Sequence, residues 1–287
     1  MHFLRKLFER EKRSAVEVVV SADTPEVPRR PRLDVGWATD VGKMREHNED
    51  TALVITAAHD GGEKRPWFGL FVLADGMGGH RAGEMASSLA ARVAAHHIAR
   101  HVYLPSLTDR EHDANRPALT EILVDAVQAA NEAVVDQLPG SGTTLTCAMV
   151  LGTQAYVGHV GDSRAYLLTE DGLDQITRDH SLLDRLISLG ELAREEAAEH
   201  PQKNVLYRAV GQSGRLDVDT HVRKVPPGDH LLLCSDGLWN MVDEEVIVKV
   251  VTAASSMQAA CEDLVAAANL AGGRDNTTAI LWRSPHG

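Results

Sequence analysis

Apolar residues recur along the chain with two spacings, and each spacing predicts a different kind of element. Runs rich in Val, Leu, Thr and aromatic residues are typical of β-strands. They cover residues 50–56, 68–74, 143–151, 154–160, 163–169 and 229–235. Helical spacing of apolar positions predicts helices over 81–103 and, most clearly, over 117–137. A last helical pair is predicted over 243–251 and 256–271, with Asp243 as the N-cap of the first helix.

The order of these elements favours an α+β fold. Strands come in runs and helices come in runs, so we expect antiparallel sheets and not a parallel doubly wound sheet. Asp171-Gly172 fits this expectation, because Asp-Gly is a common two-residue hairpin turn. We expect one folded domain over residues 34–287.

Residues 1–33 have a different pattern. Apolar and basic side chains alternate at helical spacing near the start of the chain, at Phe3, Leu4, Arg5, Lys6, Leu7, Phe8 and Arg10. Segments of this kind dock on membranes or partners in some proteins. We favour a flexible, solvated tail instead, because the stretch 1–20 has only a short amphipathic part. Pro25, Pro28 and Pro31, interspersed with arginines, then predict a linker.

Composition and charge narrow the class of protein. Hydrophobic residues make up 44% of the 287 residues and charged residues 24%, which is typical of a soluble protein with a sizeable core. The 29 Lys and Arg against 41 Asp and Glu give a net charge of −12, so nucleic acid is not an expected partner. The sequence has no run of membrane-spanning length and no signal-peptide pattern, and we therefore expect a cytoplasmic protein. We also expect it to be a monomer.

Three widely spaced cysteines, Cys147, Cys234 and Cys261, are an odd number and form no C-x-x-C pair. A disulfide framework or a thiolate zinc site is therefore not expected, and buried thiols are the simpler interpretation. None of the three has an arginine six residues later, which excludes the chemistry of a thiol phosphatase.

Aspartates stand at the ends of several apolar strands. Asp75, Asp162 and Asp236 each follow a predicted strand. Asp275 precedes a further apolar run, Thr277–Trp282. Oxygen ligands of this kind suit Mg²⁺ or Mn²⁺, although a turn is the simpler explanation for any single Asp-Gly pair. Two carboxylates about 4 Å apart repel each other by about 4 kcal/mol, so such a cluster would persist only with cations bound. The order along the chain does not itself establish that the acids converge.

Six short motifs are more specific together than any of them alone. They are Thr39–Asp50, Asp75–His80, Ser141–Thr144, Gly161–Arg164, Cys234–Leu238 and Gly273–Asn276. With these motifs in this order, the chain resembles the metal-dependent (2C-type, PPM) protein serine/threonine phosphatases, and specifically their bacterial single-domain members. The resemblance covers about residues 34–283.

The resemblance implies a fold and a metal centre. The fold is a sandwich of two antiparallel β-sheets with a pair of antiparallel helices outside each sheet, giving four αββα layers. The cofactors are two Mn²⁺ or Mg²⁺ ions bridged by Asp75, with a third ion in bacterial relatives. The implied ligands and their supports are Asp75, the Gly76 carbonyl, Asp236, Asp275, Asp162 for the third ion, and Glu49 and Asp50 near the metal waters.

The resemblance also implies a mechanism. A hydroxide between the two ions attacks phosphorus directly, without a phosphoenzyme, and the guanidinium of Arg45 holds the phosphate. Arg45, Asp75 and Asp236 are the implied catalytic residues. Some members have a histidine general acid where this chain has Met77, so water or another group would protonate the leaving alkoxide. His80 is expected to support its loop.

Residues 179–212 correspond to the flap of the bacterial enzymes, called the flap below. Asn204 stands where some relatives have a serine near the third ion, and its amide oxygen is a suitable hard ligand. The other histidines, such as His96, His97 and His101, are expected on a helix and not at a metal.

Three functional hypotheses remain open from the sequence. The first is a phosphatase of phosphoserine and phosphothreonine in proteins, opposing a cytoplasmic Ser/Thr kinase in signal transduction. The second is a catalytically weak member that serves as a regulatory binding module, which the loss of a core acid would favour; every core acid is present. The third is a phosphatase of a single phosphorylated anti-sigma-factor antagonist, a role often accompanied by sensor domains.

Overall fold

The computed structural model describes residues 34–58, 66–79, 81–108, 117–193, 196, 200–202 and 205–285. The predicted tail and linker, residues 1–33, lie outside these residues. So do His80 and Asn204.

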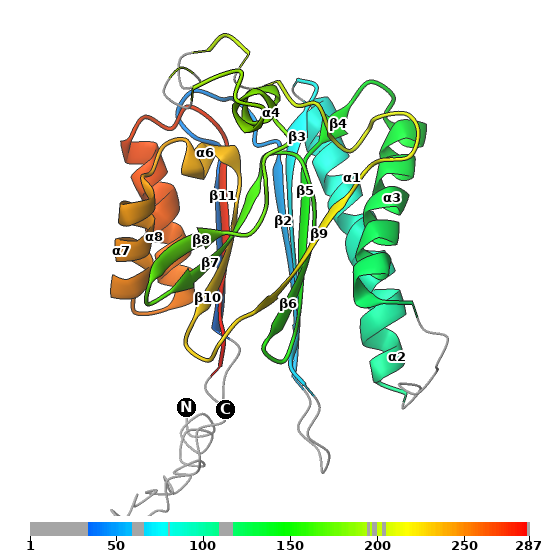
Figure 1. Cartoon of the computed structure of the whole chain (residues 1–287), viewed down its shortest axis with the longest axis vertical. Helices are drawn as coiled ribbons and strands as arrows, with labels where there is room; N and C mark the ends of the chain where they lie inside the picture. Colours follow the sequence, from blue (N-terminus) through cyan, green and yellow to red (C-terminus); the bar gives the residue numbers. More distant parts are fainter. Residues whose placement is uncertain are drawn as a thin grey trace, which may run out of the picture. The chain divides into compact units, whose positions relative to one another are not determined.

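Two β-sheets face each other in the described part of the chain (Figure 1). Sheet A has the strand order β1-β11-β10-β7-β8. Its strands are β1 (Asp34–Asp40), β7 (Arg164–Thr169), β8 (Gly172–Gln175), β10 (His230–Cys234) and β11 (Thr277–Arg283). Sheet B has the order β2-β3-β5-β6-β9, with β4 paired to β3. Its strands are β2 (Asp50–Ala57), β3 (Phe68–Met77), β4 (Gly142–Thr143), β5 (Leu145–Leu151), β6 (Gln154–Val160) and β9 (Asp219–Lys224).

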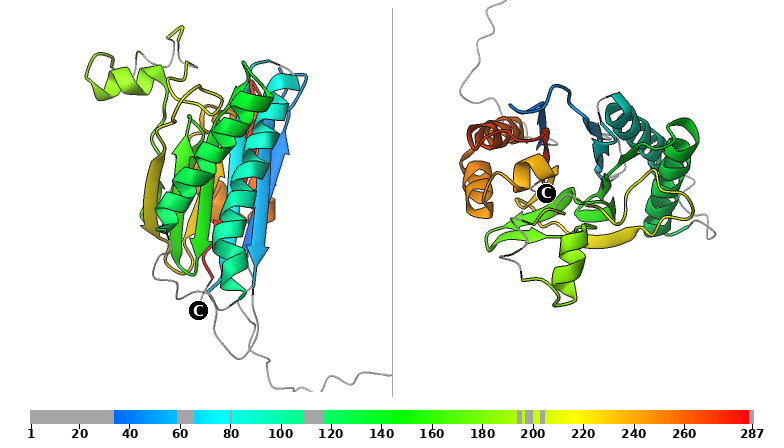
Figure 2. Two further views of the ribbon diagram at one scale, coloured as in Figure 1. Left: turned by 90° about the vertical axis from the view of Figure 1, so that its right-hand side faces the viewer. Right: turned by 90° about the horizontal axis from the view of Figure 1, so that it is seen from above.

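Helices cover the outer face of each sheet. The long helices α1 (Arg81–Ile98) and α3 (Leu119–Gln137) lie against sheet B, and α7 (Glu244–Ala253) and α8 (Met257–Leu270) lie against sheet A. The view from above in Figure 2 shows the two helix pairs on opposite sides of the sandwich. Two short helices, α4 (Leu182–Ser188) and α6 (Asp236–Trp239), lie at one end of the sandwich (Figure 1). The predicted α+β sandwich with antiparallel sheets is confirmed.

The central strands are buried on both faces, which explains why they form continuous apolar runs. Successive side chains of a strand point to opposite faces of its sheet. In β3, Leu70 and Val72 pack with the helices of sheet B, whereas Phe71 and Leu73 pack between the sheets. The same alternation holds in β10 and β11, where Trp282 is a large buried side chain between the sheets.

The structure differs from the predicted elements at several points. β1 and β9, which the apolar pattern does not predict, are edge strands with many polar residues. The predicted helix over 81–103 is α-helical to Ile98 and continues as a π-helical turn η1 (Ala99–Tyr103) and a short α2 (Leu104–Ser106). Asp243 occupies the N-cap of α7, but its side chain makes no capping hydrogen bond there.

Two further features complete the fold. Cys147, Cys234 and Cys261 are buried free thiols, as predicted. Among the helices of the described residues, none combines the length and apolar character of a transmembrane segment.

Candidate metal centre

The carboxylates that the sequence singles out lie at one end of the sandwich. β3 and β6 run in the same direction because β5 lies antiparallel between them, so Asp75 in β3 and Asp162 after β6 reach the same end. β10 and β11 are antiparallel, so Asp236 after β10 comes beside Asp275 before β11. Strand direction in each sheet therefore brings together acids that are far apart in the sequence.

A cavity of about 210 Å³ lies between these acids. The predicted site residues in its wall are Arg45, Glu49, Asp75, Gly76, Asp162, Asp236 and Asp275. Met77, Gly78, Gly79, Thr144, Leu206 and Asn276 also line it. Among the histidines singled out above, His96, His97 and His101 do not contribute to this wall. Asp75 and Asp236 therefore belong to one site, whereas Asp171 lies in the hairpin between β7 and β8. The two turn residues of that hairpin are Glu170 and Asp171, one position earlier than the predicted Asp171-Gly172, because Gly172 already pairs with Thr169 as the first residue of β8.

Asp50 is the predicted site residue that does not reach the cavity wall. It lies directly opposite Asp75 in the pairing of β2 with β3. Its Oδ2 accepts hydrogen bonds from the hydroxyls of Thr278 (2.7 Å) and Ser235 (2.8 Å). Its Oδ1 is buried and makes no hydrogen bond within the described part of the chain. A buried, unpaired carboxylate oxygen is costly, and a bound cation or its water would satisfy it.

Thr143, the last residue of β4, and Thr144 after it hold the backbone of Asp75 on both sides. The amide of Asp75 donates to Thr144 Oγ1 at 2.9 Å. Its carbonyl accepts from Thr143 Oγ1 and from the amide of Thr144, both at 2.8 Å. Thr144 Oγ1 is in turn 2.7 Å from Ser163 Oγ, beside Asp162. The Ser-Gly-Thr-Thr motif therefore positions a carboxylate rather than supplying one.

Asn276 anchors the loop that carries Arg45 and Glu49. Its Oδ1 accepts the amide of Glu49 at 2.7 Å. Its Nδ2 donates to the carbonyls of Val41 and His47, each at 2.9 Å. Sequence reasoning includes Asn276 in a motif but assigns it no role. The signal for such a role was its position next to Asp275.

Arg45 forms an ion pair with Asp275, with 2.7 Å between Nη2 and Oδ2. The Arg45 side chain is 50% exposed, so it is placed at the open side of the cavity. The predicted phosphate-binding arginine thus contacts a predicted metal ligand in this structure.

Gly76 lies where the end of β3 touches α1. A Cβ atom on Gly76 would collide with the carbonyl oxygen of Gly83 and would come within 2.7 Å of the Glu49 carbonyl. A Cβ atom on Gly83 would collide with the carboxylate of Glu49. Two glycines therefore allow α1, β3 and the Glu49 carboxylate to approach closely.

Burial, reinforced by mutual repulsion, raises the pKa values of two of the clustered carboxyl groups. Burial, reinforced by the charges of Asp50, Asp236 and Asp162, raises the pKa of Asp75 well above its ordinary value. Burial, followed by the charges of Asp162 and Asp275, does the same to the pKa of Asp236. Without cations, the cluster can therefore ionise fully only at an electrostatic cost.

The donor set fits hard divalent cations. Every candidate ligand in the wall is a carboxylate or carbonyl oxygen, as Mg²⁺ and Mn²⁺ require. Within the described residues, no three His, Cys, Asp or Glu side chains already enclose one point as a metal site. Mg²⁺ keeps several waters and takes only one or two carboxylates, so such a site does not need an enclosing cage of side chains.

The comparison with known families agrees with this site. The sequence profile of the family described as Protein phosphatase 2C matches residues 47–272. The chain therefore belongs to the protein phosphatase 2C family and is a serine/threonine protein phosphatase by type.

Named relatives place the chain among bacterial enzymes. It is 39% identical over 245 residues to serine/threonine phosphatase stp of Listeria innocua, covering 85% of this chain and 93% of that protein. It is 34% identical over 249 residues to protein phosphatase PhpP of Streptococcus pneumoniae, covering 87% and 96%.

Solved structures share the fold. The serine/threonine phosphatase PstP/Ppp of Mycobacterium tuberculosis superposes with a TM-score of 0.72 at 33% identity, covering 88% of this chain and 99% of that one. The catalytic domain of PstP in complex with two manganese ions superposes with a TM-score of 0.68 at 32% identity, over 88% and 99%.

Proposed function

We propose that the chain hydrolyses phosphoserine and phosphothreonine in proteins at a centre of two Mn²⁺ or Mg²⁺ ions, by direct attack of water and without a phosphoenzyme. The observation that carries the proposal is the meeting of carboxylates from both sheets around one cavity. Their raised pKa values indicate a cluster that cations would stabilise.

We assign the ligand roles as follows. Asp75 and the Gly76 carbonyl would hold the ions from sheet B. Asp236 and Asp275 would hold them from sheet A, and Asp162 with Asp236 would hold a third ion. Glu49 from the wall and Asp50 from behind it would orient the waters on the ions. When bound, such ions lower the pKa of a water and stabilise the charge that develops on the phosphoryl group.

Arg45 would bind the phosphoryl oxygens of the substrate. It lies in the cavity wall, and a guanidinium presents paired donors that match two phosphate oxygens. Its pairing with Asp275 keeps it at the cavity until substrate and cations compete for the two partners. Met77 in the wall has no ionisable group, so the alkoxide that leaves phosphorus would take its proton from water or another group.

The substrate of this reaction is made by a Ser/Thr kinase, and we propose that the chain opposes such a kinase in the cytoplasm. The chemistry of the substrate supports this proposal, because phosphoserine and phosphothreonine enter proteins by phosphoryl transfer.

The test is phosphate release from a phosphothreonine peptide and a phosphotyrosine peptide, with Mn²⁺ or with EDTA. We expect release from phosphothreonine that needs Mn²⁺ and falls by at least about a hundredfold in Asp236→Asn. Asp263→Asn, at an exposed position on α8, is the matched control and should keep wild-type activity. Folded protein that releases no phosphate with any metal would favour the binding-module alternative, and equal release from both peptides would contradict the Ser/Thr assignment.

A further inference from the structure

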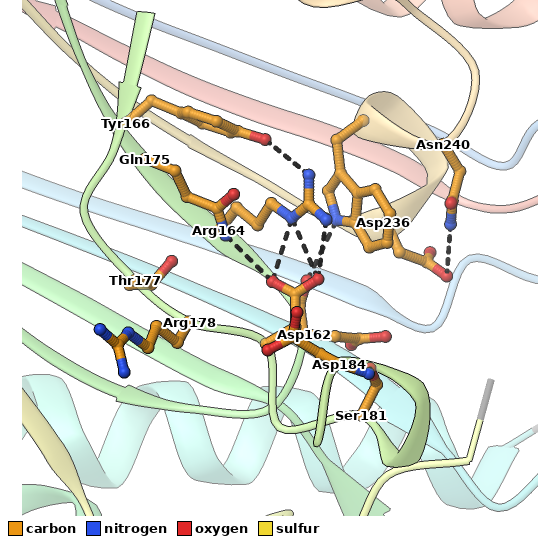
Figure 3. A network of polar contacts seen from close by, with 12 residues as sticks. Asp162, Arg164, Tyr166, Gln175, Thr177, Arg178, Ser181, Asp184, Asp236 and Asn240 are labelled. Atoms are coloured by element: carbon orange, nitrogen blue, oxygen red, sulfur yellow. Dashed lines mark hydrogen bonds and ion pairs between the residues drawn. The ribbon is translucent and has the colours of Figure 1, made fainter. Parts of the chain in front are cut away.

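One half-buried arginine outside the predicted set connects the Asp162 loop, helix α6 and Asp179, the first residue of the flap (Figure 3). Arg164 begins β7, and its side chain is 19% exposed. Its Nε and Nη2 atoms donate to both carboxylate oxygens of Asp179, with a shortest distance of 2.7 Å. Its Nη1 donates to the hydroxyl of Tyr166 at 2.9 Å. Gln175 donates a further hydrogen bond to Asp179 at 3.2 Å.

The flat face of the Arg164 guanidinium packs on the ring of Trp239. The guanidinium carbon of Arg164 lies 3.6 Å from the centre of the Trp239 ring. Trp239 Nε1 then donates to the backbone carbonyl of Asp162 at 3.0 Å. Trp239 is the last residue of α6, and Asp236 is its first. A continuous set of contacts therefore runs from Asp179, the first residue of the flap, through Arg164 to Trp239. From Trp239 it continues to the Asp162 carbonyl and to α6, the helix that begins with Asp236.

The position of these two acids depends on how two short segments outside the sheets contact each other. Asp162 lies in a loop after β6, and α6 is a four-residue turn of helix. After burial, the charge of Asp162 is the largest cause of the raised pKa of Asp236. The two carboxylates therefore repel each other when both are ionised. A lysine could not replace Arg164, because it lacks both the planar fork that binds Asp179 and the flat face that stacks on Trp239.

We propose that Arg164 is a positioning residue that, through Trp239, holds the Asp162 loop against α6 so that Asp162 and Asp236 face one cation. Through its ion pair with Asp179, Arg164 also keeps the start of the flap beside Asp162 and Asp236. The inference rests on the proposed metal centre for its functional consequence, whereas the structural link itself is independent of metal.

Two variants of the full chain cut this link at different places. Trp239→Phe keeps an aromatic ring under the guanidinium and removes the hydrogen bond to Asp162. Arg164→Lys keeps the charge and removes the fork and the stacking. Trp282→Phe is the matched control, because Trp282 is fully buried and its Nε1 makes no hydrogen bond in the described part of the chain.

The first readout is backbone amide hydrogen exchange in the metal-free proteins. We expect exchange at residues 161–163 and 236–239 to be about fivefold faster in Trp239→Phe and Arg164→Lys, the change that loss of one hydrogen bond produces. The second readout is calorimetric titration with Mn²⁺. We expect the weakest Mn²⁺ step to weaken about fivefold or more in both variants, while the tighter steps stay within about twofold.

The two readouts separate this inference from the proposed function. Unchanged local exchange and unchanged Mn²⁺ binding in both variants would overturn it. The same changes in Trp282→Phe would also overturn it, because they would reflect a general loss of packing. If the wild type binds no Mn²⁺, the proposed metal centre fails, and local exchange in the metal-free proteins still decides whether Arg164 holds the loop.

Discussion

Asp50 illustrates how single hydroxyl groups of one sheet hold a carboxylate of the other. Asp50 belongs to sheet B, whereas Thr278 in β11 and Ser235 after β10 belong to sheet A. The Thr278 hydroxyl is also 2.8 Å from Thr39 Oγ1, which accepts from Asn48 at the same distance. Asn48 donates to Thr39, so the Thr39 hydroxyl can donate to Thr278. The Thr278 hydroxyl then donates its own proton to Asp50. This arrangement orients the buried carboxylate behind Asp75.

Thr278→Val should lower the free energy of unfolding by about 1–3 kcal/mol, because it removes a hydroxyl donor to a buried carboxylate at nearly constant volume. Urea denaturation of the metal-free protein measures this change. Thr252→Val is the control, since Thr252 is an exposed residue of α7 that bonds only carbonyls of its own helix. It should change stability by less than about 0.5 kcal/mol. Equal effects of the two substitutions would contradict the role of Thr278.

The acid cluster predicts that metal binding depends on pH. Burial, reinforced by Asp179, raises the pKa of Asp162 to about 7. Burial raises the pKa of Asp50 to about 6, although the hydroxyls of Thr278 and Ser235 oppose this. From about pH 4 to about pH 7, the folded metal-free protein holds protons that the unfolded chain has released. The contribution of these groups to the free energy of unfolding therefore falls as the pH rises through this range.

Cations must displace these protons, so Mn²⁺ affinity should fall as the pH drops below about 7. Calorimetric titration at pH 6 in two buffers of different ionisation enthalpy should show proton release on Mn²⁺ binding, and the release should be smaller at pH 8 because Asp162 and Asp50 are then largely ionised. Binding without proton release at pH 6 would show that the carboxyl groups are already ionised in the metal-free protein.

At the scale of elements, the contact between β3 and α1 determines where the cavity wall lies. The two glycines at this contact let the start of α1 approach the end of β3, and Glu49 packs beside them. The alanine-rich face of α1 packs on sheet B along the rest of the helix. That packing alone would not require the first turn of α1 to lie so near the end of β3.

Gly76→Ala should destabilise the protein by about 1–3 kcal/mol, because the added methyl group meets backbone atoms on two sides and cannot be relieved by a side-chain rotation. Chemical denaturation measures the effect. Gly172→Ala serves for comparison: its φ of 124° is strained for alanine, but its Cβ would have no atom within 4 Å. A smaller loss at Gly76 than at Gly172 would argue against the close contact.

At the scale of the whole molecule, the proposed ligands come from both sheets. Asp75 lies in β3 of sheet B, and Asp162 lies in the loop that leaves sheet B after β6. Asp236 follows β10 and Asp275 precedes β11, both strands of sheet A. Away from this end of the sandwich, buried apolar side chains such as Phe71 fill the space between the two sheets. Cations at this end would replace repulsion across the sandwich with attraction.

Mn²⁺ should therefore raise the melting temperature, and EDTA should reverse the change. A free Mn²⁺ concentration a hundred times the dissociation constant stabilises the folded state by about 2.7 kcal/mol per site. Differential scanning calorimetry measures the shift, and Asp75→Asn should abolish most of it because Asp75 is the proposed bridging ligand. A full shift in that variant would place the cations elsewhere.

Much of this protein was predictable from local sequence. Strands such as β3, β6 and β10 are continuous apolar runs because both of their faces are buried, and α3 has clear helical spacing. The acids of the cavity were identifiable because they follow or precede such strands within recognisable motifs.

The remaining features depend on contacts between parts of the chain that are distant in sequence. β1 and β9 form by pairing at the edges of the sheets. Their sequences are too polar to show the apolar pattern that predicts a strand. The positions of Asp50 behind the wall, of Asn276 under the Arg45 loop and of Arg164 between Asp179 and Trp239 depend on partners far away in the chain. The order of residues along the chain identified the candidate ligands. Strand direction and the packing of the two sheets determined which of them meet, because hydrogen bonds and charge repulsion act over a few ångströms in space and not along the chain.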